Sequence, residues 1–207
     1  MTLIIIALTS IISIIAFSNS VLFDKLQLNP YQVYHKREWY RIISHGFLHA
    51  DWVHLFVNML VLYSFGSSVE QIFKYLATEG VIQSPILMFV ILYFSSMVMA
   101  TVTTVKKQKD NIWYNSVGAS GAVSAIVFTS IFFQPMSSVY FYAVIPIPGI
   151  VFGVLYLAYS QYMSKRGGDN INHDAHFIGA VFGFVFPLFL DPKLIHVFLD
   201  QLLNFNN

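Results

Sequence analysis

Apolar runs alternate with polar connections along the whole chain. The runs cover residues 2–23, 51–73, 84–105, 119–133, 146–163 and 174–190. Most contain about the 20 residues that a helix needs to cross a bilayer. The first lacks the basic start and small-residue cleavage site of a signal peptide, so we expect it to be retained as a helix. The pattern predicts an all-α polytopic membrane protein with a bundle of six transmembrane helices, in one domain over residues 1–207.

The fourth run is the shortest, and it follows directly on a polar loop. It holds about 15 residues, or roughly 22 Å of helix, before Gln134 and Pro135 end it. The hydrocarbon core of a bilayer is about 30 Å thick, so this helix is predicted to start inside the membrane. Unpaired backbone groups are costly in lipid, so the loop at 113–118 must line a protected, wet cavity.

Composition agrees with a membrane location. Of the 207 residues, 57% are hydrophobic and only 10% are charged, whereas soluble domains carry about 25% charged residues. A net charge of +1 gives no basic surface for nucleic acid, so we expect no nucleic-acid partner. The chain has no cysteine, which excludes disulfides, thiolate nucleophiles and cysteine-ligated metals.

Ser120 stands at the predicted start of the short helix, in the sequence Gly118-Ala119-Ser120-Gly121. On these letters alone a helix cap or a small packing residue is the commoner explanation. As a nucleophile it would have amides of the helix N-terminus beside it. His176 lies near the start of the sixth run, where a histidine faces either a cavity or the membrane interface.

Small residues connect these two candidates. Gly121 and Ala125 follow Ser120, and Gly179 and Gly183 follow the histidine, in each pair four residues apart. Such spacing lets two helices approach closely. If the fourth and sixth helices pack along these positions, the serine and the histidine meet, which is the minimal activated nucleophile.

His54 and Asn58 lie four residues apart and share one face of the second helix. They could hydrogen-bond to each other in a structural role. In a catalytic role they would donate hydrogen bonds to the oxyanion formed when Ser120 attacks a carbonyl, together with the amides of Ala119 and Ser120.

His45 and His49 are also four residues apart and raise the question of a metal or haem site. The chain has no HExxH motif, and no run offers a central histidine pair. We therefore expect no metal and no cofactor. In the alternative, these histidines hydrogen-bond and fix the loop before the second helix.

In this order along the chain, the motifs together resemble the rhomboid family of intramembrane serine proteases. The resemblance covers about 39–187 and is carried by Glu38-Trp39-Tyr40-Arg41, by His49-Ala50-Asp51-Trp52-Val53-His54-Leu55-Phe56-Val57-Asn58, by Gly118-Ala119-Ser120-Gly121, and by His176 with Gly179 and Gly183. It implies an enzyme that cleaves transmembrane segments of other membrane proteins, so the expected partners are transmembrane protein substrates and the lipid bilayer. The oligomeric state stays open.

By motif position the resemblance implies roles for individual residues. Ser120 would be the nucleophile and His176 the general base, with His54, Asn58 and the Ser120 amide in the oxyanion hole and no acid as a third member. The fifth helix and the loop 165–173 look like a lateral gate and a cap. Structural support is expected from the remaining motif residues, Trp39, Arg41, His49, Gly118, Gly121, Gly179 and Gly183.

The family topology places the protein in a bacterial plasma membrane, with the active site opening to the extracytoplasmic side. Under that topology nine of the 11 Lys and Arg residues lie on the site's side, with Lys74 and Lys193 on the other. This distribution runs against the positive-inside tendency.

Two positions depart from the family pattern. An aromatic residue often stands four after the nucleophile, where its ring packs on the histidine, and here that residue is Ser124. Tyr40 precedes Arg41 where a tryptophan is usual. The alternatives to a protease are a non-catalytic rhomboid-like binder or chaperone, which would lack Ser120 or His176, and a transporter, which would show paired halves.

Overall fold

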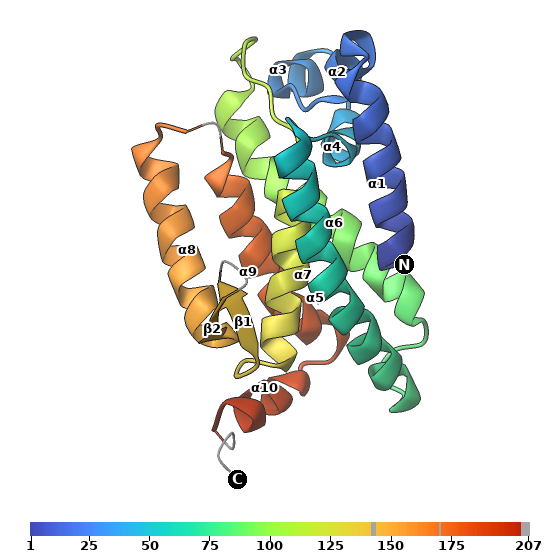
Figure 1. Cartoon of the computed structure of the whole chain (residues 1–207), viewed down its shortest axis with the longest axis vertical. Coiled ribbons are helices and arrows are strands. Elements are labelled where there is room, and N and C mark those ends of the chain that lie inside the picture. The colour runs from blue at the N-terminus through green and yellow to red at the C-terminus, as the bar shows by residue number, and fades with distance from the viewer. Residues whose placement is uncertain (142–143, 170, 204–207) are drawn as a thin grey trace.

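The computed structural model describes residues 1–141, 144–169 and 171–203, and its helices pack around a central one (Figure 1). That helix is α7 (Ser120–Phe133), in which every residue from Gly121 to Phe133 is buried. The other elements are α1 (Thr2–Phe17), α2 (Ser20–Leu26), α3 (Pro30–His35), α4 (Arg41–Ser44), η1 (His45–Phe47), α5 (Trp52–Thr78), α6 (Pro85–Gln108), β1 (Ser138–Phe141), β2 (Ile145–Pro148), α8 (Gly149–Arg166), α9 (His173–Leu190) and α10 (Leu194–Leu203).

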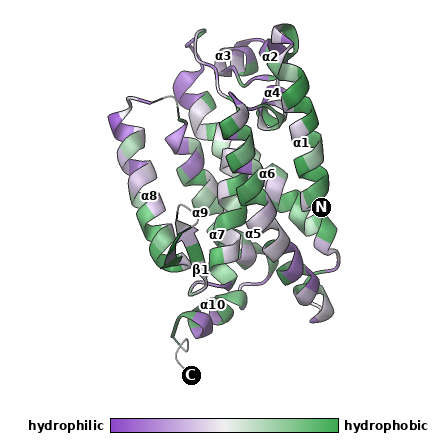
Figure 2. Cartoon of the chain, in the orientation of Figure 1, coloured by the Kyte–Doolittle hydropathy of each residue, from purple (hydrophilic) through white to green (hydrophobic). Residues whose placement is uncertain are grey.

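Length and hydropathy identify membrane-crossing helices. Within the described residues, three helices are long and apolar enough to cross a membrane: α5, α6 and α9. The helices α1, α7 and α10 are apolar but shorter. Hydrophobic residues run along the bundle, and hydrophilic residues gather toward its two ends (Figure 2). The expectation of a helical polytopic membrane protein is confirmed, whereas the count of six spans stays a prediction.

The first predicted helix is broken. Instead of running to residue 23, α1 ends at Phe17, and α2 begins at Ser20. The side chain of Asn19 accepts a hydrogen bond from the backbone N–H of Leu22 and so caps α2. Asparagine is a strong N-cap residue, so it favours a new helix start over continuation.

The fifth predicted helix starts later than expected because its first residues form a strand. β1 and β2 pair antiparallel, with Ser138 opposite Pro148 and Tyr140 opposite Pro146. Proline has no backbone N–H and is tolerated at the edge of a sheet. The prediction of an all-α fold is therefore wrong over this hairpin, which the backbone N–H of Gly149 ties back to the carbonyl of Ser137.

The backbones of α7 and α9 touch directly. A Cβ atom added to Gly179 would lie 2.1 Å from the carbonyl oxygen of Gly121, and one added to Gly183 would lie 2.1 Å from that of Ala125. Thr129 also donates a hydrogen bond to the carbonyl of Gly183 across 2.8 Å. The prediction that these two helices pack along their small residues is confirmed.

The connection between α1 and α5 is held together by Arg41, which is buried. Its Nε donates to Glu38 across 2.6 Å, and its Nη1 donates to the carbonyl oxygens of Asp24 and Gln27. The hydrogen bond from Arg41 also lowers the pKa of the Glu38 carboxyl. Arg41 thus joins Glu38 to the segment at 24–27, and its role in supporting the site stays a prediction. Trp39, in contrast, is 54% exposed, where its ring suits the membrane interface.

Candidate active site

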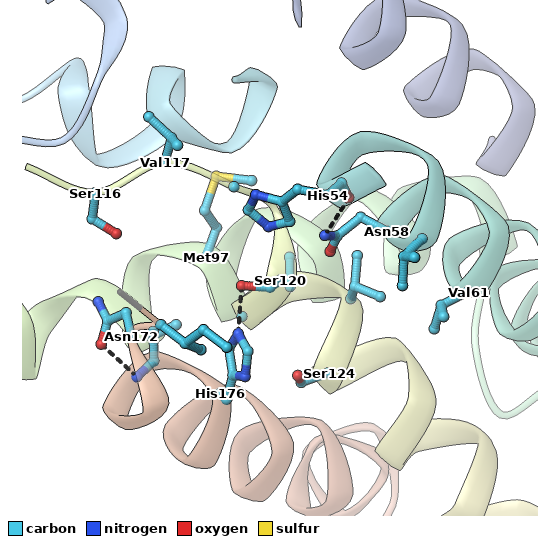
Figure 3. A pocket seen from close by; sticks show the side chains of 18 of the residues that line it. His54, Asn58, Val61, Met97, Ser116, Val117, Ser120, Ser124, Asn172 and His176 are labelled. Carbon is cyan, nitrogen blue, oxygen red and sulfur yellow. Dashed lines mark hydrogen bonds between the residues drawn. The ribbon is translucent and has the colours of Figure 1, made fainter. Parts of the chain in front are cut away.

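Ser120 and His176 lie within hydrogen-bond distance although 56 positions separate them in the sequence. Ser120 is the first residue of α7, and His176 lies in the first turn of α9. The distance from Oγ of Ser120 to Nε2 of His176 is 2.7 Å (Figure 3). The contact follows from the close approach of α7 and α9, because each residue stands just before the small residues through which the helices touch.

The N-termini of α7 and α9, which meet at this site, differ in their capping. Asn172 caps α9 by accepting from the N–H of Ala175, and its Nδ2 donates to Thr104 on α6. The N-cap of α7 is Ala119, whose methyl group cannot accept a hydrogen bond. The first N–H groups of a helix lack intrahelical acceptors, so the amides at the start of α7 remain available to a ligand beside Ser120.

His54 reaches the same place from α5. The backbone N–H of Ala50 points at Nδ1 of His54 across 3.4 Å, which makes Nδ1 the acceptor and leaves the ring proton on Nε2. The ring lies against Gly118, where an added Cβ would be 2.9 Å from Cε1 and 3.1 Å from Nε2. Gly118 also has a φ of +118°, a backbone conformation that residues other than glycine rarely adopt.

Asn58 lies one turn further along α5 and is buried. Its Nδ2 donates to the backbone carbonyl of His54 across 2.9 Å. The structural alternative, a bond between the two side chains, is therefore not the one formed. The bond to the carbonyl uses one of the two amide hydrogens of Asn58 and leaves the other for a ligand.

A cavity of about 950 Å³ joins these groups. Ser120, His176, His54 and Asn58 all line it, and in Figure 3 the side chains of Ser120, His54 and His176 point toward one another. Its remaining walls are mostly apolar and include Val57, Val61, Phe65, Phe128 and Phe152. The cavity predicted from the polar loop before the short helix is thus present, and it extends from the serine along apolar side chains of α5, α7 and α8.

Comparison with known proteins assigns the family. The family model described as Rhomboid domain matches residues 36–193, which is more than half of the chain. The chain belongs to the rhomboid family. It is also similar to the rhomboid-like protein 12, mitochondrial, of Arabidopsis thaliana, with 29% identity over 143 residues. That match covers 67% of this chain and 43% of the relative, so the rhomboid chain aligns with less than half of the relative's length.

The acidic residue nearest to His176 in the rhomboid sequence, Asp174, forms its hydrogen bonds with other residues. Asp174 accepts hydrogen bonds from Lys107, across 2.6 Å, and from Ser164. The described hydrogen bonds of Asp174 thus go to Lys107 and Ser164, and that the site works without a third, acidic member stays a prediction. Nδ1 of His176 has no hydrogen-bond partner among the described residues.

Tyr156 is the site residue that sequence reasoning missed. It lies on α8, where its hydroxyl is 2.6 Å from that of Ser124 and its ring stacks on the ring of His176. In the sequence it is one aromatic residue among many in an apolar run, so no motif marks it. The signal available was the unusual Ser124, which indicated that the histidine must be oriented by something else.

His45 and His49 fix the loop before α5, as the structural alternative expected. Nδ1 of His45 bonds the carbonyl of Arg41, and the carbonyl of His45 accepts from the N–H of Gly118. Nδ1 of His49 lies 3.1 Å from the hydroxyl of Ser13 on α1. Burial lowers the pKa of His45 to about 4 and that of His49 to about 3, because the charged ring loses its solvation.

These two pKa values predict acid destabilisation. In the unfolded chain the histidine pKa is about 6.5. Between pH 6.5 and 4 the unfolded state therefore binds more protons than the folded state, and the free energy of unfolding decreases as the pH is lowered. We expect the thermal midpoint in detergent to be at least about 5 °C lower at pH 5 than at pH 7.5. His45→Asn should reduce this difference, whereas His196→Gln, at an exposed position, should not. If the thermal midpoint changed equally between pH 7.5 and pH 5 in the wild type and in His45→Asn, burial of His45 would not be a cause of the acid destabilisation.

Proposed function

We propose that this rhomboid protein is an intramembrane serine endopeptidase that cleaves transmembrane segments of other membrane proteins. The observation that carries the proposal is the 2.7 Å contact between Ser120 and His176, made at an uncapped helix start that faces a cavity. A serine bonded to an imidazole is the smallest arrangement that activates a hydroxyl for attack on a carbonyl. Family membership alone is shared by active and inactive proteins, so the geometry of the dyad is the stronger argument.

The chemistry follows from the two side chains. Oγ of Ser120 attacks the carbonyl carbon of the scissile bond while Nε2 of His176 takes the hydroxyl proton. The same nitrogen then protonates the leaving amine, and the acyl-enzyme remains on Ser120. Water attacks the ester, again losing its proton to His176, and releases the second product. The dyad works without an acid, since Asp174 is engaged elsewhere.

The negative oxygen of the tetrahedral intermediate would be held by several donors. The proposed donors are Nε2 of His54, the free amide hydrogen of Asn58, and the backbone N–H groups at the start of α7, from Ala119 and Ser120. The positive end of the helix dipole adds to their effect. His54 and Asn58 lie on α5 and Ser120 begins α7, and all three line the same cavity.

We expect His54→Ala and Asn58→Ala each to lower kcat by about 10² to 10³, because each removes one oxyanion donor. KM should change much less. The measurement is steady-state cleavage of a single-span substrate in liposomes. Ser64→Ala, one turn and a half further along α5 and exposed to the outside of the bundle, is the matched control and should keep wild-type kcat. A full rate in either site variant would remove that residue from the oxyanion hole.

Access to the cavity is proposed at α8. The buried residues of this helix are Gly149, Gly153 and Ser160, and most of its other side chains are partly or fully exposed. A helix held by so few buried residues separates from the bundle more readily than α7 does. This supports α8 as the lateral gate that the family resemblance implies. The cap role of the loop 165–173, whose residue 170 lies outside the described residues, stays a prediction.

We propose that the cavity opens away from the cytoplasm, as the resemblance implies. The accessibility of tags from either side of the membrane would measure this orientation. The basic residues oppose it, because all but Lys74 and Lys193 belong to the cavity side under this topology. The relative is mitochondrial by its name, so the expected bacterial plasma membrane gains no support from it.

The test of the proposed function is cleavage of single-span substrates by the purified protein in liposomes. Release of two fragments that depends on Ser120 supports the protease. A protein that binds several such substrates without cutting any would favour the non-catalytic rhomboid-like binder.

A further inference from the structure

The imidazole of His176 makes one hydrogen bond within the described part of the chain. Its Nε2 bonds Ser120, while Nδ1 has no hydrogen-bond partner in the described part of the chain. One hydrogen bond fixes the distance to the serine but leaves the ring free to tilt about that contact. Proton transfer needs the reacting atoms held within a fraction of an ångström. Something other than hydrogen bonding must therefore hold the plane of this ring.

Tyr156 provides the packing that the hydrogen bonds do not. The rings of Tyr156 and His176 are nearly parallel, with an angle of 16° between their planes and centroids 6.3 Å apart. This separation lies within the range of offset-stacked aromatic pairs. The ring of His173 contacts His176 from another direction, edge to face at 5.9 Å. An aromatic ring of α8 thus lies nearly parallel to the imidazole and next to it.

Tyr156 is itself fixed at both ends. Its hydroxyl is 2.6 Å from Oγ of Ser124, a buried residue of α7. Its ring packs against Phe128, one turn further along α7, with centroids 5.6 Å apart, and against Phe152 on its own helix. A phenol held at its oxygen and along its ring can keep a neighbouring imidazole in one plane.

Ser124 explains why the ring comes from another helix. It lies one turn after Ser120 on the same face of α7, and its short side chain ends at the hydroxyl of Tyr156 rather than at His176. The space between position 124 and the histidine is thus filled from α8. We propose that Tyr156 is the positioning residue for His176, and that Ser124 fixes Tyr156 in that place.

This inference rests on the proposed protease function and adds a coupling to it. Because Tyr156 belongs to α8, the imidazole keeps its orientation only while α8 lies against α7. Outward displacement of the proposed gate helix removes the stacked ring, so the open state admits substrate with a poorly aligned base. Alignment returns when α8 closes.

The test compares substitutions that separate the ring from its hydroxyl. Tyr156→Phe loses the bond to Ser124 but keeps the ring and its packing on Phe128 and Phe152, so kcat should fall by no more than about threefold. Tyr156→Ser removes the ring, and kcat should fall by about 10- to 100-fold with KM within about threefold. The exchange Tyr156→Ser/Ser124→Tyr returns an aromatic ring to the same space from α7, with composition unchanged, and should recover kcat to within about tenfold of wild type.

Three results would overturn the proposal. They are a wild-type kcat in Tyr156→Ser, a loss in that variant confined to KM, and an exchange variant that melts like wild type but is as slow as Tyr156→Ser. Thermal melts are recorded for every variant. If Tyr156→Ser does not fold, the comparison of Tyr156→Phe with Tyr156→Leu decides, and equal kcat in the two would overturn it.

A readout without catalysis separates this proposal from the protease itself. The ¹⁵N resonances of the His176 imidazole report the hydrogen bond between Nε2 and Ser120 whether or not any substrate is cut. We expect one tautomer in wild type and in Tyr156→Phe, and averaged resonances in Tyr156→Ser. Unchanged resonances in Tyr156→Ser would overturn the positioning role. An inactive wild type whose resonances respond as expected would overturn the protease function alone.

Discussion

Ser120→Ala is expected to abolish cleavage of a single-span substrate in liposomes, with a loss of roughly 10⁴-fold or more in kcat. The residual rate of a serine protease without its nucleophile comes only from binding and the oxyanion donors. The variant removes one oxygen atom, and the close contact between α7 and α9 does not depend on it. Folding should therefore be retained, and labelling of the protein by a fluorophosphonate should disappear with activity.

His176→Ala should lose as much activity, and the double variant no more than either single one. Members of a catalytic unit are not additive, because each is useless without the other. Ser95→Ala is the matched control, since among the described residues that partly exposed hydroxyl on α6 bonds carbonyls of its own helix and no group of the site. Continued cleavage by Ser120→Ala, or loss of activity in Ser95→Ala, would show that the mechanism is wrong.

Gly183→Ala is expected to have the largest effect on folding. The added Cβ would lie 2.1 Å from the carbonyl oxygen of Ala125 and 2.4 Å from its Cα, and both are backbone atoms of a buried helix. Neither can move without shifting α7 away from α9. Overpacking of this kind costs about 3 kcal/mol or more. We expect a fall of about 5 to 10 °C in the thermal midpoint or loss of the folded protein.

Gly153→Ala is the matched control for this prediction. Its added Cβ would meet Phe128 at 3.4 Å, an ordinary van der Waals contact at the edge of a side chain. Alanine is also the better helix former by about 1 kcal/mol. Its thermal midpoint should stay at or above that of wild type. Equal melts for the two variants would mean that α7 and α9 separate without cost and that the small residues serve another purpose.

The parts of the molecule that the sequence predicts well depend on periodicity and on short-range packing. The spacing of Gly121, Ala125, Gly179 and Gly183 was sufficient to predict which helices touch and which two side chains meet. These residues act through their size alone, and their positions in a helix follow from its period. The site geometry is therefore largely contained in local patterns.

Other features depend on tertiary contacts that no local pattern contains. The predicted fifth helix begins at residue 146, but Pro146 and Pro148 belong to β2, which pairs with β1. Tyr156 on α8 stacks on His176 on α9, and no sequence motif links the two residues. The break before Asn19 arises because Asn19 caps a new helix within an apolar run. Hydropathy does not report capping, so it predicts one continuous helix there.

The central position of α7 also has a consequence for how the protein is made. With 14 residues, or about 21 Å, this helix is too short to cross the hydrocarbon by itself, and its uncapped start leaves polar amides exposed. During synthesis it leaves the ribosome well before α9, the helix against which it is closest packed. Until residues 173–190 follow, α7 can pack against α5 and α6 but lacks its closest partner. We expect the nucleophile to reach its final depth only when the base is inserted, so that a partly made chain has no protease activity.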